Sequence, residues 1–417
     1  ERFMISYLQA LKLIEKNCKK KRASSVDLKN AEGLIAALDV KSPTKHPPFD
    51  NSAMDGFAVI ANDTLLANMN KPVQLKIANK MAAGDKPKYK KHKNEKKIAI
   101  EIMTGAIIEK PFNAVIPYEQ TNKKNKNFVM ISSKISKHAN IRNAGEDFGI
   151  NALVIKNGEK ISPQHQMACA ALGISKIVAY SKPKISVFST GKELVNSNKK
   201  TLVPGKIRNS NGLFLKTAIP HMGAEVKFLK TNLDNEKKLL NDLIHIVKMK
   251  SSDVIISTGA VSAGKYDFVP KALKKAGAKI IFHKVSIRPG RPILFAKFSN
   301  GTAYFGLPGN PISVAVGLRF FVYPYLRSMQ GLKREVFDNA ILENEKKTKK
   351  GFLFFQKARK FSSKKGNISV KILPKQQSAM IEPFTKSNCW AILGEKNNRH
   401  ISGSIINIAP LYSCEYN

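Results

Sequence analysis

Between residues 184 and 329, short apolar segments alternate with longer amphipathic ones, and no other feature of the sequence constrains the fold as strongly. The pattern predicts strands at residues 185–188, 226–229, 254–256 and 280–285, a hairpin formed by 293–298 and 302–305, and helices at 210–222, 235–249, 268–276 and 312–329. Strands that are almost uniformly apolar are buried on both faces, so they belong to a parallel sheet with helices on each side. We therefore expect a central α/β domain with a mostly parallel sheet over residues 181–330, which binds ligands at the carboxyl ends of its strands.

The flanking parts of the chain have the short, closely spaced strands that are typical of β domains. One group of strands, at residues 57–60, 73–77, 98–103, 113–117 and 128–131, predicts a small all-β domain over residues 56–133. A second group, at residues 352–355, 368–372, 390–393 and 405–408, predicts a C-terminal β barrel or sandwich over residues 335–417.

Two N-terminal segments have helical patterns, and we expect the two helices to pack together. Residues 6–17 have Ser6 and Gln9 in the positions of a capping box, and Leu8, Leu11 and Ile14 lie at helical spacing. Residues 26–38 form a second amphipathic pattern. With a further helix at 163–172, these segments predict a helical linker domain made of residues 1–55 and 134–180, into which the small β domain is inserted.

The formal net charge of +41 would suit a nucleic-acid partner, because clustered Lys and Arg side chains neutralise phosphates. The lysines are, however, spread over nearly every surface-type segment. Their runs at residues 19–22, 86–97 and 346–350 lack the interleaved aromatic residues of a single-strand binder. The abundance of Lys, Asn and Ile fits AT-rich codon usage instead. We therefore expect no nucleic-acid partner.

The sequence has no uninterrupted apolar run of about 18 residues and no signal-peptide pattern at its start, so we expect a soluble cytoplasmic protein with no membrane partner. The four cysteines, Cys18, Cys169, Cys389 and Cys414, form no C-x-x-C pair. This spacing argues against a zinc site and a disulfide framework and predicts reduced thiols.

An irregular segment at residues 47–59 places two carboxylates, an amide and a hydroxyl within six positions, at Asp50, Asn51, Ser52 and Asp55. The double proline before the cluster ends any helix, and the run after Gly56 is extended, so the cluster lies on a loop that leads into a strand. Two interpretations are open: the side chains satisfy only their own backbone, as in an Asx turn, or they form a functional site.

Three loops of the α/β domain lie where a parallel sheet binds its ligands. Two of them follow a strand with the sequence Ser-Thr-Gly, at Ser189-Thr190-Gly191 and Ser257-Thr258-Gly259. The third is Gly306-Leu307-Pro308-Gly309-Asn310-Pro311, with Ser313 in the first turn of the following helix. Small residues in such loops let backbone N–H groups approach an oxyanion, but a tight strand-to-helix turn requires them for steric reasons as well.

Charged residues gather at the same rim. Lys284, Arg288 and Arg291 surround a Pro-Gly turn, where they are either an oxyanion site or ordinary solvated cations. The carboxylates Glu193, Asp234 and Asp267 follow strand ends, and carboxylates opposite an anion site suggest a bridging Mg²⁺. We interpret His283, which is next to Lys284, as a structural histidine.

Several of these motifs resemble one family, the molybdopterin molybdenumtransferases, which are related to the C-terminal domain of gephyrin. The matching stretches follow the family's order over nearly the whole chain: Pro48-Phe49-Asp50-Asn51-Ser52-Ala53-Met54-Asp55-Gly56-Phe57-Ala58-Val59, Ile102-Met103-Thr104-Gly105-Ala106, Arg142-Asn143-Ala144-Gly145-Glu146-Asp147, Phe188-Ser189-Thr190-Gly191-Lys192-Glu193-Leu194, Asn209-Ser210-Asn211 and Gly306-Leu307-Pro308-Gly309-Asn310-Pro311. The resemblance implies a four-part elongated homodimeric enzyme that inserts molybdenum from molybdate into adenylated molybdopterin, with Mg²⁺-dependent release of AMP. It also suggests molybdopterin adenylyltransferase and apo-molybdoenzymes as partners.

The resemblance further implies a role for individual residues. The functional acidic and hydroxyl positions that it assigns to catalysis are Asp55, Thr104, Asp147, Glu193, Asp234 and Asp267, of which Glu193, Asp234 and Asp267 are the expected metal ligands. The positions expected to bind the substrates are Ser189, Thr190, Gly191, Asn211, Ser257, Gly259, Lys284, Arg288, Arg291, Pro308, Gly309, Asn310, Ser313 and Ser378. Because Asp55 belongs to the N-terminal half, we expect it to meet the anion loops only across a dimer interface.

Four rim positions depart from the family pattern. Lys192 and Lys265 replace the usual acidic residues, and Arg288 and Arg291 replace the usual lysines. These changes make the site more positive, which either tightens anion binding or weakens Mg²⁺ binding. Three alternative functions are a gephyrin-like scaffold, a tungsten-specific relative and an adenylylating relative of the same pathway.

Overall fold

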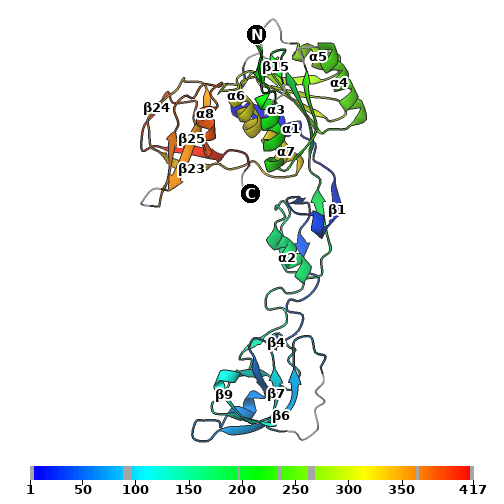
Figure 1. Cartoon of the computed structure of the whole chain (residues 1–417), viewed down its shortest axis with the longest axis vertical. Helices are drawn as coiled ribbons and strands as arrows, with labels where there is room; N and C mark the ends of the chain where they lie inside the picture. Colours follow the sequence, from blue (N-terminus) through cyan, green and yellow to red (C-terminus); the bar gives the residue numbers. More distant parts are fainter. Residues whose placement is uncertain are drawn as a thin grey trace.

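The protein is elongated, with two large bodies joined by a slender middle part (Figure 1). The computed structural model describes residues 4–87, 96–195, 198–232, 236–261, 268–362 and 366–413. The upper body in the figure contains the α/β sheet and the C-terminal strands, and the lower body contains the strands labelled β4, β6, β7 and β9. The predicted domain boundaries remain a prediction.

The α/β sheet has six strands, in which apolar residues alternate between two helical layers. Its strand order is β17 (Glu225–Asn232), β14 (Lys184–Thr190), β18 (Val254–Thr258), β22 (Ala303–Leu307), β21 (Leu294–Lys297) and β19 (Lys279–His283). The first four strands are parallel, and β21 is antiparallel to both of its neighbours, so the predicted mostly parallel sheet and its hairpin are confirmed. Val187 packs in one apolar cluster and Phe188 in the other, as expected for a strand buried on both faces.

Helices cover both faces of this sheet. One layer contains α4 (Glu236–Met249) and α5 (Val269–Lys275), and the other contains α1 (Tyr7–Lys16), α3 (Ser210–Ala218) and the continuous helix formed by α6 (Pro311–Gly317), the π-turn η5 (Leu318–Val322) and α7 (Tyr323–Met329). The predicted capping box of α1 is confirmed, because the Ser6 hydroxyl accepts from the Gln9 backbone N–H at 3.2 Å while the Gln9 side chain accepts from the Ser6 N–H at 2.8 Å. Leu8, however, does not belong to the buried face of this helix and is 56% exposed.

The C-terminal strands close into a five-stranded barrel, so of the predicted barrel or sandwich the barrel is the one formed. Around the barrel, β25 (Leu353–Ser362) is followed by β26 (Ile368–Ile372), β23 (Asp338–Leu342), β29 (Ile405–Pro410) and β27 (Cys389–Leu393), and β27 pairs with β25 again. A short strand from the α/β part of the chain, β20 (Ile287–Arg288), pairs with β25 from outside the ring. The barrel and the α/β layer also share one apolar cluster, in which the Phe320 and Phe355 rings stack with centroids 3.9 Å apart.

The lower body has a six-stranded sheet, as the short strands predicted. Its order is β8 (Ala114–Pro117), β5 (Gly56–Val59), β7 (Ile98–Ile102), β6 (Val73–Met81), β10 (Phe128–Ile131) and β9 (Thr121–Asn125). Next to it, β4 (Asn51–Ser52) pairs with β11 (Ile141–Arg142), which joins the loop of residues 47–55 to the segment around Asp147.

The predicted helix at residues 26–38 is wrong. These residues form the end of β1 (Ala23–Asp27), a 3-10 turn (Leu28–Asn30) and β2 (Ile35–Ala36), and both strands pair with β13 (Lys176–Tyr180). Gly33 lies between them with a φ of +73°, a left-handed conformation that interrupts a helix. Pairing with a strand about 150 residues away thus overrides the local helical pattern. The first helix consequently packs against α7 and not against a second N-terminal helix.

The middle part also contains α2 (Pro163–Ala171), close to its predicted position, and a ribbon of β3 (Val40–Lys41) and β12 (Leu153–Ile155). Among the described cysteines, Cys18, Cys169 and Cys389 are free thiols, and burial raises the pKa of each. Within the described part of the chain, no helix combines the length and apolar character needed to cross a bilayer.

Candidate functional site

Two adjoining cavities lie at the carboxyl end of the α/β sheet. The larger, about 600 Å³, is lined by the turns after β14 and β18, and we call it the glycine cavity. The smaller, about 380 Å³, is lined by the Arg288-to-Pro292 turn, and we call it the arginine cavity. Ala260, Gly309 and Asn310 line both, so the two cavities form one continuous groove.

Two Ser-Thr-Gly turns pack against each other to form the floor of the glycine cavity. The Thr190 hydroxyl donates to the Thr258 carbonyl at 2.9 Å. Gly259 has a φ of +88°, and a Cβ at this position would lie 2.6 Å from the Thr190 carbonyl oxygen. The close packing of the turns therefore requires glycine here, so the steric explanation applies to Gly259 whatever the cavity binds.

Two of the predicted positions in these turns lie behind the cavity floor. Ser189 and Ser257 are fully buried, and neither lines a cavity among the described residues. Ser257 accepts a hydrogen bond from the buried Tyr304 hydroxyl at 2.6 Å. The Ser189 hydroxyl has no hydrogen-bond partner within the part of the chain that the structure describes.

A two-stranded ribbon places Glu193 at the rim of the glycine cavity. It consists of β15 (Leu194–Val195) and β16 (Ile207–Arg208), and the Ile207 N–H donates to the Glu193 carbonyl at 2.8 Å. The Glu193 carboxylate lies against Gly191, because a Cβ on that glycine would be 2.4 Å from its Oε1 atom. Sequence reasoning missed Arg208, which also lines the cavity and donates to the Lys199 carbonyl at 2.7 Å.

The remaining residues of the glycine cavity come from the start of α3 and the loop after β22. Asn209 caps α3 by accepting from the Gly212 N–H at 2.9 Å, and Asn211 donates from its amide to the Gly309 carbonyl at 2.6 Å. This contact connects two of the predicted motifs directly. The N-terminus of α3 consequently faces the groove, where the helix dipole favours an anion.

The arginine cavity lies between the α/β sheet and the barrel. Arg288 is held by the pairing of β20 with β25, and its guanidinium carbon lies 4.9 Å from the centroid of the Phe352 ring. Arg291, Pro308 and Ser313 also line this cavity. The barrel contributes Ser378, whose hydroxyl accepts from the Asn310 amide at 2.9 Å and whose carbonyl accepts from the Ile312 N–H at 3.0 Å.

Lys284 follows β19 with a φ of +79° and is not among the described residues that line the two cavities. Its neighbour His283 donates from Nε2 to the Val261 carbonyl at 2.8 Å, which fits the predicted structural histidine. Of the predicted acidic ligands, Asp234 and Asp267 lie outside the described residues, as does the departure at Lys265. In the described part of the chain, no group of three His, Cys, Asp or Glu side chains is arranged to hold a metal ion.

Sequence reasoning also missed Lys357, a fully buried lysine on β25. Its ammonium group donates to the carbonyls of Lys375, Gln377 and Met380 at 2.8, 3.2 and 2.9 Å. Burial lowers its pKa to about 8. The loop that Lys357 holds contains Ser378, so this lysine supports the barrel's wall of the groove. The one sequence signal that could have identified Lys357 is a lysine in an otherwise mostly apolar strand segment.

The polar side chains of the acidic loop at residues 47–55 make both local and long-range contacts. Asn51 and Ser52 make short-range contacts, to the carbonyls of Phe49 and Met54 at 3.2 and 2.6 Å, as in an Asx-type turn. The two carboxylates instead reach other segments of the chain. Asp50 accepts from the Ala144 N–H at 2.7 Å.

Asp55 and Thr104, two predicted site residues, are brought together by this loop. Asp55 Oδ1 accepts from the Thr104 N–H and from its hydroxyl, both at 2.7 Å. These two hydrogen bonds lower the pKa of Asp55, the backbone bond being the larger cause, and so favour the charged form that a carboxylate already has at neutral pH. Asp147, the third predicted residue of this region, lies 4.0 Å from the His46 ring.

Within one chain these residues are far from the groove. The loop of Asp55 precedes the lower sheet, and β4 lies in the lower body, whereas β15, next to Glu193, lies in the upper body (Figure 1). The structure therefore forms two groups of predicted site residues at different ends of the molecule. It does not unite them within one protomer.

Known proteins are similar to this chain in sequence and fold along nearly its whole length. Residues 5–173 match the model of the MoeA N-terminal region (domains I and II), and residues 186–328 match the model of a probable molybdopterin-binding domain. A molybdopterin molybdenumtransferase of Haemophilus influenzae is 33% identical over 389 residues, covering 92% of this chain and 93% of the relative. One from Synechococcus elongatus is 31% identical, covering 90% and 92%. The crystal structure of a molybdopterin biosynthesis MoeA protein from Pyrococcus horikoshii superimposes with a TM-score of 0.81 at 26% identity, covering 98% of this chain and all of that chain.

Proposed function

The chain belongs to the molybdopterin molybdenumtransferase family, a family of transferases of molybdenum cofactor biosynthesis, and we propose that it inserts molybdenum from molybdate into adenylated molybdopterin and releases AMP. The observation that carries this proposal is the pair of cavities that meet at Ala260, Gly309 and Asn310. The reaction requires a nucleotide-bearing pterin and a tetrahedral oxyanion to lie side by side. A groove with one larger anion-binding part and one smaller cationic part suits that pair of substrates.

We assign molybdate to the arginine cavity. Arg288 and Arg291 line it together with Ser313 and Ser378, so two guanidinium groups and two hydroxyls surround the space. Guanidinium groups bind oxyanions through paired N–H donors. The Ser378 hydroxyl accepts from Asn310 and therefore keeps its own proton to donate to an anion. Lys284, whose backbone N–H donates to the Ile293 carbonyl at 3.0 Å next to this turn, is proposed to add positive charge.

We assign adenylated molybdopterin to the glycine cavity. Its volume of about 600 Å³, the small residues at Gly191 and Gly259, and the start of α3 suit a ligand that carries phosphate groups. Thr190 and Asn211 line the same space, and Arg208 adds a cation. Asn310 lines both cavities, so it is placed to contact both substrates, and Asn211 holds the neighbouring Gly309 carbonyl from the glycine cavity.

We propose that Mg²⁺ binds at this rim through the predicted carboxylates, of which the structure describes Glu193. Glu193 provides one oxygen ligand in the glycine cavity, and Asp234 and Asp267 are the other proposed ligands. Oxygen donors are the ligands that Mg²⁺ prefers, and when bound it would neutralise charge on the departing phosphate. Glu193 itself holds its carboxylate over Gly191, next to the Thr190 turn where we place the phosphate.

The groups in the lower body enter the reaction through a second copy of the chain. Asp55, Thr104 and Asp147 do not reach the groove of their own protomer, and we propose a homodimer in which they face the groove of the partner. Each of the two composite sites then combines the anion-binding groove of one protomer with the carboxylates of the other. Molybdopterin adenylyltransferase, as the source of the substrate, and apo-molybdoenzymes, as acceptors of the product, are the corresponding proposed partners.

The purified protein tests this proposal directly. Incubated with adenylated molybdopterin, it should release AMP only when both molybdate and Mg²⁺ are present. Omission of either component is the control. AMP release that does not depend on molybdate, or ATP consumption with unmodified molybdopterin, would contradict the proposed reaction.

A further inference from the structure

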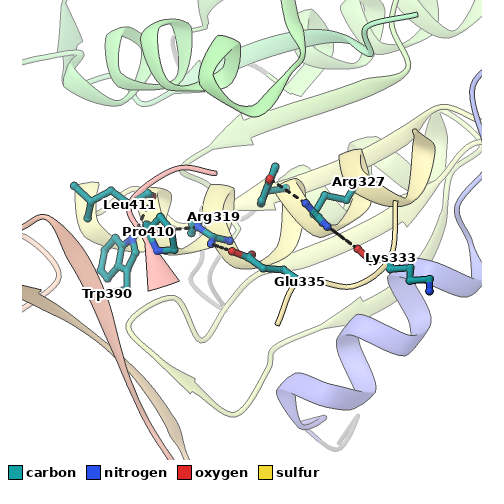
Figure 2. Close-up of polar contacts among 8 residues, drawn as sticks. Arg319, Arg327, Lys333, Glu335, Trp390, Pro410 and Leu411 are labelled. Atoms are coloured by element: carbon teal, nitrogen blue, oxygen red, sulfur yellow. Dashed lines mark hydrogen bonds and ion pairs between the residues drawn. The ribbon is translucent and has the colours of Figure 1, made fainter. Parts of the chain in front are cut away.

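A single long helix connects the groove to the barrel. The residues that begin α6, Pro311 and Ser313, line the groove, and Arg319 lies about two helical turns further along in the π-turn η5. Single π-turns inside α-helices are frequent at functional positions. Figure 2 shows the polar contacts that Arg319 and Arg327 make from this helix.

Arg319 joins three separate parts of the chain. Its Nη2 atom donates to Glu335 Oε1 at 2.6 Å, and its Nε atom donates to the carbonyl of Pro410 at 2.9 Å (Figure 2). Glu335 belongs to the linker between α7 and the barrel, and Pro410 ends β29, the last strand of the barrel. The Arg319 and Glu335 side chains are only 1% and 8% exposed, so water does not compete for these contacts.

The Arg319 guanidinium packs against two aromatic rings, with its carbon 5.2 Å from the Phe320 centroid and 5.1 Å from the Tyr323 centroid, but its hydrogen bonding is incomplete. Its third nitrogen, Nη1, is buried and has no hydrogen-bond partner within the described part of the chain. An unpaired buried donor costs about 1–3 kcal/mol. Replacing a buried ion pair by apolar side chains of similar volume is often neutral or stabilising. What an apolar side chain cannot provide is the pair of directed hydrogen bonds that fixes Pro410 and Glu335 relative to the helix.

The fixed position of the barrel determines the shape of the groove. The barrel supplies Ser378, Ala379 and Ile381 to the groove wall, and the α/β layer supplies Asn310 opposite Ser378. Because the barrel is closed, a shift at β29 is transmitted through β27 to β25, the strand whose Lys357 holds the Ser378 loop.

We propose that Arg319 is a positioning residue of the groove, which fixes the barrel on the helix so that Ser378 stays opposite Asn310. The residue touches neither substrate, and its effect is exerted through Pro410 and Glu335. The inference rests on the proposed function for the identity of the ligand. The hydrogen bonds of Arg319 to Glu335 and Pro410, which we call the clamp, do not depend on that identity.

The test compares three full-length proteins: the parent, the double variant Arg319→Met/Glu335→Met and the single variant Arg327→Met. The double variant removes the clamp without leaving Glu335 buried and unpaired, so it should fold even where a single change at Arg319 does not. Arg327 is the matched control because it lies on the same helix, is 4% exposed and donates to the Lys333 carbonyl in the linker and to the Tyr323 hydroxyl.

Molybdate binding is measured by calorimetry at a temperature where all three proteins are folded, and amide hydrogen exchange is followed over residues 374–381. The double variant should bind molybdate at least tenfold more weakly, or about 1.4 kcal/mol, and exchange this loop faster. Arg327→Met should match the parent in both. A fourth protein, the conservative variant Arg319→Lys, should keep part of the affinity that the double variant loses.

Affinity and exchange in the double variant that equal those of the parent would overturn the proposal. If the parent itself binds no molybdate, the proposed function is contradicted, but hydrogen exchange still decides whether Arg319 holds the loop. Faster exchange in the double variant alone then supports the clamp, and equal exchange in all three proteins refutes it.

Discussion

Two inactive variants of this chain, Asp55→Asn and Glu193→Gln, should restore activity to each other when they are mixed. Asp55 lies in the loop before the lower sheet and Glu193 lines the groove of the upper body, so each variant damages a different half of the proposed composite site. Each change alone should lower kcat by about 100-fold or more, since it removes a charged group from the reacting region.

The expected recovery follows from the geometry of a two-fold dimer. Random exchange of equal amounts of two chains gives heterodimers as about one half of all dimers. In a heterodimer, one site combines the intact groove of the Asp55→Asn chain with the intact lower body of the Glu193→Gln chain, and the other site carries both changes. The mixture should therefore reach about one quarter of parental activity, and heterodimers isolated with two different affinity tags about one half.

Molybdate-dependent AMP release is the assay, and each variant exchanged with itself is the control. If the complete site lay within one protomer, no mixture would contain an intact site. Tagged heterodimers that are no more active than the single variants would refute the composite site.

Two further predictions concern the groove. Burial lowers the pKa of Lys357 to about 8, so its side chain is charged below that pH and loses one of its three N–H donors above it. Molybdate affinity should therefore fall as the pH rises through about 8. In a calorimetric pH series, Lys357→Arg should remove this dependence, because arginine does not titrate in this range. A series in which both proteins show the same dependence would contradict that role. Gly259→Ala should destabilise the protein by about 2–4 kcal/mol in denaturant unfolding, because a left-handed φ is combined with a 2.6 Å contact to the Thr190 oxygen. Gly277→Ala, where φ is +83° and no atom lies within 4 Å, should cost only about 1–2 kcal/mol, and equal costs would show that the turn contact is unimportant.

The elements that the sequence predicts well are those fixed by local or periodic signals. The buried strand around Val187 and Phe188 is rich in apolar residues, and the capping residues Ser6 and Gln9 lie three positions apart, so both signals are local. The helix predicted at residues 26–38 fails for the opposite reason. Its Val26 pairs with Ile177, and no local pattern encodes a partner so distant.

The location of the groove could be predicted from the sequence, but its shape could not. Parallel strands indicate at which edge a ligand binds, and the motifs at Gly191, Gly259 and Gly309 identify the loops. The contacts that give these loops their geometry are long-range: Asn310 meets Ser378, Arg319 meets Pro410, and Lys357 holds carbonyls about 20 positions away. Buried cations that serve such contacts look like ordinary surface residues in a chain with a net charge of +41.

The separation of opposite charges between the two bodies has an electrostatic consequence. Asp55 is ionised at neutral pH and its hydrogen bonds to Thr104 lower its pKa further, while Arg288 and Arg291 line the groove of the other body. If these groups were neighbours in one folded unit, a pair of charges 4 Å apart would attract by about 4 kcal/mol at an effective dielectric constant of 20. The carboxylate and the guanidinium would then form an ion pair and would not be available to ligands. Kept apart within a chain, the arginines remain available to an oxyanion and the carboxylate to a cation. In the proposed dimer they face each other across the groove, so that the substrate anion and Mg²⁺ lie between them and take the contacts that the protein's own charges would otherwise make.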